Sequence, residues 1–418
     1  MEDADKTAAV EVQPGFFKRT FEAFGYRDFR LMWAGAFTST TGTWMQSVAQ
    51  SWLVLEMTGA KSAFFLGLLG FLQDLPIMLF SLIGGVVADR IDRRKILLGS
   101  QYVQMTCAFI LTLLVYFKVV RVGHMMILVV FAGTAMSFGG PAYQALIPGL
   151  VERKVVPNAV ALNSIQFNLA RVIGPLIAGI TMAALGAATC FFLNGLSFIA
   201  VIIGLYLIRA TFLPQKTTES VLEGIQSGFA FIRKRGALWQ LTVLGFISTF
   251  CGIPLLTLLP VIAKNTFQLD AKGYSYLLSI SGIGSILGAL IYAGMSQRKN
   301  HGLLALRVQL IFAIVLAIFA ITRFLPLSCL CLFACGMCLI TLFSSINSLV
   351  QLTVTEEMRG RVMSIFMLSF RGGMPLGNLV AGYFASKFSP AHTLFALACI
   401  LAVTALAFLF SNSGIKKL

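Results

Sequence analysis

Three charged side chains stand inside otherwise apolar stretches of the sequence, where they could act in chemistry. Arg171 lies in NLARVIGPLIAG (168–179), and Arg371 lies in LSFRGGMPLGNLVAG (368–382). Asp74, in GFLQDLPIMLF, is the acidic residue that lies well inside such a stretch. A carboxylate partly desolvated beside a cation can load and release a proton as its surroundings change. We therefore predict that Asp74 carries protons, with a static ion pair as the alternative.

The two arginines could instead receive an anionic substrate directly. A lone charge at the centre of a membrane helix costs about 2.5–3.5 kcal/mol on insertion scales, so both should face water or an anion rather than lipid. Glu56, near the end of the first apolar stretch, is a second candidate for proton transfer. It could equally be a solvated carboxylate.

The stretches that hold these charges are long enough to cross a membrane. The 418-residue chain is 58% hydrophobic and 11% charged, with a mean hydropathy of +0.87, whereas soluble domains average about 25% charged residues. A spanning helix needs about 20 mainly apolar residues. The sequence predicts an all-α membrane protein with twelve spans, near 31–56, 63–88, 96–117, 123–147, 158–184, 188–208, 237–263, 273–296, 303–322, 327–352, 362–386 and 391–411.

The distribution of basic residues predicts how the spans are oriented. Most of the 32 lysines and arginines fall in the loops on one side, if the N-terminus is placed in the cytoplasm. This places both termini inside and explains the net charge of +16 without a nucleic-acid partner. The expected organisation is an N-terminal segment 1–30, a bundle 31–208, a linker 209–236 with an amphipathic helix, a bundle 237–411 and a tail 412–418.

The two sets of six spans resemble each other. Arg171 and Pro175 recur as Arg371 and Pro375, in the fifth span of each set, and AKSAFFL (60–66) recurs as AKGYSYL at the start of the eighth span. Two parallel halves that handle substrate where they meet are typical of a secondary transporter. Prolines are expected to interrupt the fourth and seventh spans.

The loop after the second span carries the most specific motif. In GGVVADRIDRRKILL (84–98), a glycine is followed by Asp-Arg and then by a basic pair, at Gly85, Asp89, Arg90, Arg93 and Arg94. This resembles the signature loop of the major facilitator superfamily, except that Asp92 stands where a glycine is usual.

Other stretches resemble the branch that holds the enterobactin exporter and the macrolide efflux proteins, a transmembrane secretion effector family. They are GTWMQSVAQSWLVLEMTG (42–59), PAYQALIPGLVERKVVPNAVALNS (141–164) and EEMRGRVMSIF (356–366). The resemblance implies a major facilitator fold, with two pseudo-symmetric six-helix bundles. In that fold, spans two, five, eight and eleven flank the cavity between the halves, so the resemblance also implies that Asp74 pairs with Arg371 or Arg171. It also implies that the signature loop latches the two halves when the carrier faces outward; the alternative is that its charges only set topology.

The fifth span resembles the antiporter motif of the superfamily, through Gly174, Pro175 and Gly179. Small residues let helices approach closely and a proline bends a helix. The resemblance therefore favours export by exchange, although the same residues would also serve plain helix packing.

Other functions are disfavoured by what the sequence lacks. It contains no GxxxxGK[ST] phosphate-binding loop, so an ion gradient rather than ATP is the expected energy source. No catalytic constellation or cofactor motif is found. Cys331, Cys335 and Cys338 share one helical face and could bind a soft metal, but no histidine or carboxylate is nearby. All eight cysteines fall within spans, where cysteine commonly packs as a small apolar residue, so no metal site is expected.

The sequence thus predicts a carrier, not an enzyme, in a bacterial-type inner membrane. We expect it to export an amphiphilic drug or siderophore by proton antiport with alternating access, and to act as a monomer. Trp44, Met45, Trp52 and Tyr143 could form an adaptable apolar cavity or be ordinary packing residues. The alternatives are a lysophospholipid carrier and a membrane sensor or partner-binding protein that transports nothing.

Overall fold

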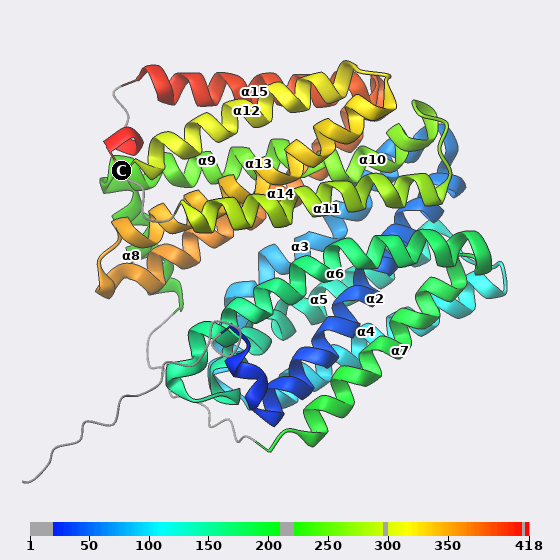
Figure 1. The fold of residues 1–418 in the computed structure, drawn as a ribbon, viewed down its shortest axis with the longest axis horizontal. Coiled ribbons are helices and arrows are strands. Elements are labelled where there is room, and N and C mark those ends of the chain that lie inside the picture. The colour runs from blue at the N-terminus through cyan, green and yellow to red at the C-terminus, as the bar shows by residue number, and fades with distance from the viewer. Residues whose placement is uncertain (1–19, 210–220, 296–299, 412–413, 418) are drawn as a thin grey trace, which may run out of the picture.

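The fold is described from a computed structural model. It covers residues 20–209, 221–295, 300–411 and 414–417, and the expected segments 1–19 and 412–413 and most of the linker before Val221 lie outside them. Long helices run roughly lengthwise through the molecule and gather in two bundles, one above the other in Figure 1.

The first bundle follows a short 3-10 helix, η1 (Glu22–Gly25). Its helices are α2 (Arg27–Thr58), α3 (Ser62–Arg90), α4 (Arg93–Tyr116), α5 (Val122–Leu146), α6 (Val156–Leu185) and α7 (Ala187–Leu207), with short 3-10 turns η2 (Gly59–Lys61), η3 (Ile147–Leu150) and η4 (Arg153–Val155) between some of them.

The second bundle follows α8 (Val221–Lys234). Its helices are α9 (Gly236–Gly252), α10 (Pro254–Asn265), α11 (Ala271–Gly294), α12 (His301–Ile321), α13 (Leu325–Thr353), α14 (Glu356–Lys387) and α15 (Pro390–Phe410), and the 3-10 turn η5 (Gly414–Lys417) comes last.

The helix pattern agrees with twelve spans. Ten segments pass a test of length and hydropathy, and the first of these, Arg27–Ser81, contains both α2 and most of α3. Helix α14 is not among those ten, although it is as long as its neighbours. The number of spans is twelve when α3 is counted separately, α14 is added, and α9 and α10 are treated as one span. The predicted fold class is therefore confirmed.

Local sequence explains where several helices begin and end. The Asp92 carboxylate accepts a hydrogen bond from the Arg94 backbone N–H at the start of α4, and Asp270 does the same for Gly273 at the start of α11. Gly186, with a φ of 81°, makes the sharp turn between α6 and α7.

The prolines act differently from what the sequence suggested. The seventh span does break at Pro254, which begins α10, where a missing N–H costs nothing. The fourth span does not break, because α5 runs through Pro141 as a continuous helix.

Buried apolar residues form three cores, and their placement defines two ends of the molecule. We call the end where α2 begins and α3 ends the linker end, because α8 lies there, and the end where α2 finishes and α11 begins the far end. One core holds residues of both bundles, such as Val48, Leu66, Leu258 and Leu277, towards the far end. At the linker end each bundle has a core of its own.

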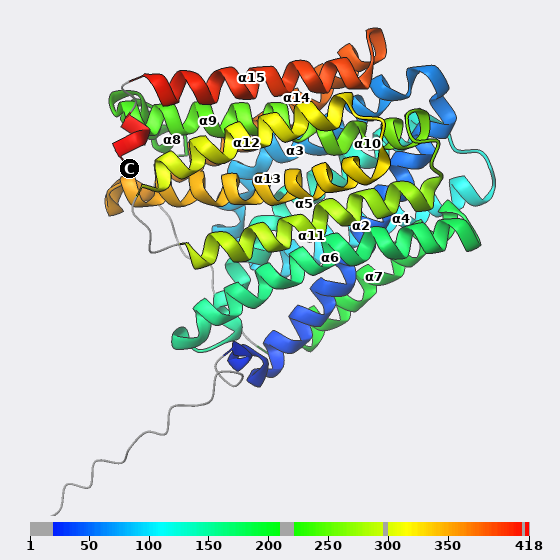
Figure 2. The same ribbon diagram turned by 45° about the horizontal axis from the view of Figure 1, so that its top comes forward.

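The arrangement of the helices agrees with the placement of the cores. Helices α3 with α14, and α6 with α11, are neighbours across the two bundles. Figures 1 and 2 show the bundles close together at the right, where the far end lies, and diverging towards the left.

The linker helix packs on the second bundle. Ile232 is 1% exposed and belongs to the core around Phe366, and Gly228 lies against the backbone of Arg361 on α14. Phe229, on the same helix, is 47% exposed. The amphipathic helix therefore covers α14 with part of its apolar face, which was not expected from the sequence.

Candidate functional site between the two bundles

Asp74 and Arg371 face each other from α3 and α14. Asp74 follows Gly67 and Gly70 on one stripe of α3, and on α14 Arg371 shares a stripe with Asn378 and Gly382. The two charges interact electrostatically, although no Arg371 nitrogen lies within 4.0 Å of an Asp74 oxygen in the described coordinates. Of the two predicted partners, the structure thus brings Arg371 to Asp74.

Directly beyond this pair, α3 and α14 cross at very short range. A methyl group added at Gly382 would lie 2.7 Å from the Gly67 Cα, and one at Gly70 would lie 2.7 Å from the Asn378 amide nitrogen. Asn378 is 3% exposed and its amide oxygen accepts a hydrogen bond of 2.7 Å from the Thr257 hydroxyl of α10. Glycine at these positions is therefore what lets the bundles touch here.

Arg171 has aromatic neighbours instead of an acid. Its guanidinium carbon lies 5.7 Å from the centre of the Trp44 ring of α2, and that ring meets Phe167, one turn earlier on α6, edge to face at 6.3 Å. Arg171 is half-buried and Arg371 is exposed. The two arginines thus occupy matched positions in the sequence and different environments in the fold.

The glycines of the antiporter-like motif serve two different contacts. Gly174 lies against Trp44 and the Thr41 carbonyl of α2, within the first bundle. Gly179 lies against Ser275 of α11, across the bundle interface. Pro175 is buried inside α6, which remains one helix. Close packing is what these residues do in this conformation.

An aromatic cluster joins the bundles at the far end. Trp52, which is 6% exposed, stacks on Tyr274 of α11 with the ring centres 6.0 Å apart, and the Lys264 ammonium lies 5.8 Å from the centre of the Trp52 ring. The Trp52 indole N–H donates a hydrogen bond of 2.9 Å to Glu56. Trp52 and Glu56 also line a cavity of about 330 Å³ beside Asp270 and Lys272.

The other predicted cavity residues lie apart from one another. Met45 is 4% exposed and belongs to the shared core. Tyr143 is partly buried near the linker end of α5, where its hydroxyl donates to the Asn163 side chain of α6. Together with Trp44 and Trp52, they therefore do not form one surface in this conformation.

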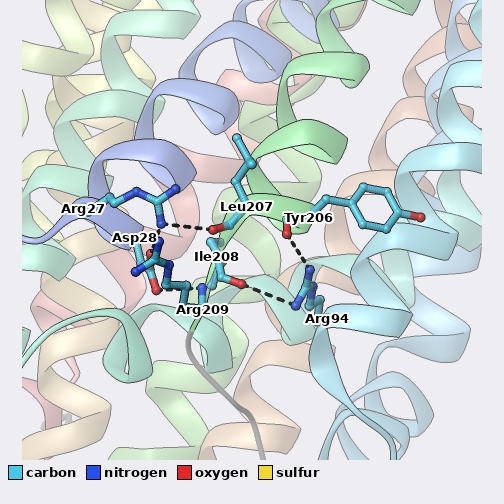
Figure 3. A network of polar contacts seen from close by, with 7 residues as sticks. All are labelled: Arg27, Asp28, Arg94, Tyr206, Leu207, Ile208 and Arg209. Atoms are coloured by element: carbon cyan, nitrogen blue, oxygen red, sulfur yellow. Dashed lines mark hydrogen bonds and ion pairs between the residues drawn. The ribbon is translucent and has the colours of Figure 1, made fainter.

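The signature loop is anchored within the first bundle. Arg94 donates to the Tyr206 carbonyl at 2.9 Å and to the Ile208 carbonyl at 3.4 Å, at the end of α7, as Figure 3 shows. Arg27, from the start of α2, donates to the Leu207 carbonyl in the same network. These cations satisfy carbonyls that the last turn of a helix leaves free.

The contacts described for the remaining motif residues lie within the first bundle. Arg93 donates to the Ala145 carbonyl of α5 at 2.9 Å, Arg90 is exposed, and a methyl group added at Gly85 would meet nothing within 4 Å. The Asp89 side chain lies outside the described part of the chain. The latch expected from the resemblance stays a prediction, which concerns a conformation with the linker end closed.

Sequence reasoning missed Asn378, Tyr274 and Phe167. Tyr274 and Phe167 belong to no motif, so no spacing singles them out. A signal was present for Asn378, because a buried amide in a membrane helix normally finds a partner on a neighbouring helix. Within the described ranges, no group of three or more His, Cys, Asp or Glu side chains is arranged to hold a metal ion.

Several known transporters are similar to this chain in sequence. The Staphyloferrin A transporter of Staphylococcus aureus is 26% identical over 395 residues, which is 93% of this chain and 97% of the relative. The multidrug efflux pump Tap of Mycolicibacterium fortuitum is 26% identical and covers 87% of this chain and 90% of its own. An enterobactin exporter of Shigella boydii is 26% identical over 81% of this chain and 78% of its own.

Solved structures share the fold at low sequence identity. A nucleoside transporter superimposes with a TM-score of 0.73 at 15% identity, over 92% of this chain and 98% of its own. An inward-facing bacterial homologue of the human lysosomal transporter Spinster superimposes with a TM-score of 0.71 at 14% identity, over 95% of this chain and 97% of its own.

The family model described as transmembrane secretion effector matches residues 19–415. The relatives and the structural neighbours are transporters, which confirms the prediction of a carrier rather than an enzyme. The chain belongs to the transmembrane secretion effector family of the major facilitator superfamily, and it is a multi-pass membrane transporter.

Proposed function

We propose that this protein exports an amphiphilic drug or siderophore across the cytoplasmic membrane by proton antiport with alternating access. Its N- and C-termini lie in the cytoplasm in this proposal, because the linker end carries most of the basic residues. The observation that carries the proposal is the placement of the cores. One shared core joins the bundles at the far end, and separate cores leave them apart at the linker end.

Asp74 and Arg371 stand next to the closest approach of α3 and α14. Towards the far end, Gly67 and Gly382 bring the two helices together, and Met78 still approaches Gly372 one turn beyond Asp74. Protonation of Asp74 would remove its attraction to Arg371 and so change the free energy of this contact. A proton bound at Asp74 would thereby favour one of the two conformations, which is what coupling requires.

Transport in everted membrane vesicles tests this proposal. A panel of macrolides, catechol siderophores and lysolipids is offered to respiring vesicles, and accumulation inside them is measured with and without a protonophore. Vesicles that contain the Gly382→Leu variant serve as the matched control, because this change obstructs the α3–α14 contact.

The expected result is accumulation of at least one drug or siderophore that the protonophore abolishes. Movement of lysolipid alone, unaffected by the protonophore, would replace the proposal with a lysophospholipid carrier. If no compound moves while the protein binds one of them, the fold serves as a sensor or partner-binding protein instead.

A further inference from the structure

The charges at mid-depth between the bundles do not balance. Arg371 has Asp74 opposite it, whereas Arg171 makes no hydrogen bond or ion pair with any described residue. Among the described residues, its guanidinium instead has a cation–π contact with the Trp44 ring. Two cations and one carboxylate leave one positive charge uncompensated at this level.

The backbone of Arg171 lies beside the bundle interface, because its carbonyl oxygen is near Gly282 of α11. The neighbouring residue, Val172, contacts α11, since its carbonyl accepts a 3.2 Å hydrogen bond from the Ser279 hydroxyl and its side chain lies against Gly282. Long side chains on a helix lean towards its N-terminus. The guanidinium therefore extends from the level of Val172 towards the linker end, where the bundles have separate cores.

The aromatic residues beside Arg171 supply an apolar surface. Phe167 is 50% exposed and lies one helical turn from Arg171 on the linker-end side. Trp44 is half-buried, with one ring face near the guanidinium and its edge near Phe167. The five N–H donors of an arginine point outward in the plane of its guanidinium. When the guanidinium lies over an indole, these donors stay available to an oxyanion.

We propose that Arg171, Trp44 and Phe167 form the substrate-recognition site and that the substrate is an anionic amphiphile. Its carboxylate, catecholate or phosphate group binds Arg171, and its apolar part lies on Phe167 and Trp44. This inference rests on the proposed export function and deepens it by naming the substrate class. The two matched arginines then have different roles. Arg171 binds the substrate, and Arg371 interacts with Asp74.

Charge selectivity follows from the same imbalance. A charge-assisted hydrogen bond contributes about 1.5–3 kcal/mol, so loss of Arg171 should weaken binding of an anion about tenfold or more. A cation of the same shape meets a positive charge without a counter-ion and should bind more weakly than the anion. Cationic drugs are therefore expected to be poor substrates.

Binding of two probes that share their apolar part and carry opposite charges tests the proposal on purified full-length protein in nanodiscs. The probes are pyrenebutyrate and pyrenebutyl-trimethylammonium, which share the ring and differ in charge. The chain has four tryptophans, so replacing Trp33, Trp52 and Trp239 by Phe leaves Trp44 as the reporter. Quenching of Trp44 fluorescence gives the dissociation constants.

The expected result is tighter binding of the anion, with an affinity about tenfold or more lower in Arg171→Gln and partly restored in Arg171→Lys. Arg307→Gln, which removes an exposed cation from α12, is the matched control and should leave both affinities unchanged. Equal affinity for the two probes, or an equal loss in both variants, would overturn the proposal.

Because this assay needs no transport, its outcome is separate from that of the export proposal.

A second arm compares a citrate-headed amphiphile with lysophosphatidic acid, in binding and then in proteoliposome transport. Binding of both with transport of the citrate compound alone identifies a carboxylate substrate. Transport of lysophosphatidic acid identifies a phosphate substrate. Both results support the anionic site, and export of a cationic macrolide without loss in Arg171→Gln contradicts it.

Discussion

Gly382→Ala should shift the balance between the two conformations of the carrier. The added Cβ would lie 2.7 Å from the Gly67 Cα and 2.8 Å from the Ala63 carbonyl oxygen. Carbon atoms prefer separations of about 3.5–4.0 Å, so the bundles would have to part by roughly 1 Å at the far end. Both neighbours are backbone atoms, which cannot turn aside as a flexible side chain does.

The size of the shift follows from this clash. Overpacking costs about 1–3 kcal/mol, and the cost falls only on the conformation in which α3 and α14 touch at the far end. The ratio of far-end-closed to far-end-open molecules should therefore fall by a factor of about 5–150. This factor does not depend on how the wild type divides between the two conformations.

Distances between spin labels measure this ratio. One pair, at Ala60 and Phe388, reports the far end, and a second pair, at Ile91 and Gly360, reports the linker end, in a background where the exposed Cys399 is replaced by serine. In Gly382→Ala the far-end distance should lengthen as the linker-end distance shortens.

A glycine without close neighbours provides the control for this experiment. A methyl group at Gly99, in α4, would meet nothing within 4 Å. Gly99→Ala should leave both distance distributions as in the wild type. Unchanged distributions in Gly382→Ala, or the same change in both variants, would refute the steric argument.

Three further predictions concern stability. Trp52→Ala should lower the free energy of unfolding by about 3–5 kcal/mol in nanodiscs, because it removes a buried ring from between the bundles, and Trp52→Phe should lose less. Arg94→Gln, which frees two α7 carbonyls, should cost about 1–2 kcal/mol, while the exposed Arg90→Gln should cost less than about 0.5 kcal/mol. The hydrogen bond from Lys154 lowers the pKa of Glu152. Its stabilising effect should be present above the usual glutamate pKa and disappear as the pH falls through the lowered value, so the melting temperatures of wild type and Glu152→Gln should converge in acid; a constant difference would contradict this.

The sequence was sufficient to predict the spans, because each needs a long apolar segment whatever it packs against. Asp74, Arg171 and Arg371 were also identifiable, since a charge in such a segment is costly and therefore rare. The matched fifth spans, α6 and α14, followed from the repeated arginine and proline.

The rotation of each helix could not be predicted in the same way. Lipid is as apolar as a protein core, so hydropathy does not distinguish a residue such as Met45, which is buried, from one that faces a cavity or the membrane. For the same reason, the choice of Arg371 over Arg171 as the neighbour of Asp74 required coordinates. The crossing at Gly67 and Gly382 depends on pairing two distant helices, and no local pattern specifies that pairing.

Proton release on addition of substrate tests the central claim most directly. Everted vesicles with an acidic interior are given the substrate identified by the transport panel, and the external pH is followed for the wild type, Asp74→Asn and Asp74→Glu. Proton antiport through Asp74 predicts substrate-triggered release in the wild type, none in Asp74→Asn and partial release in Asp74→Glu. Release that persists in Asp74→Asn, at the wild-type rate and with the wild-type amount of protein in the membrane, would contradict the claim and leave Asp74 as a structural partner of Arg371.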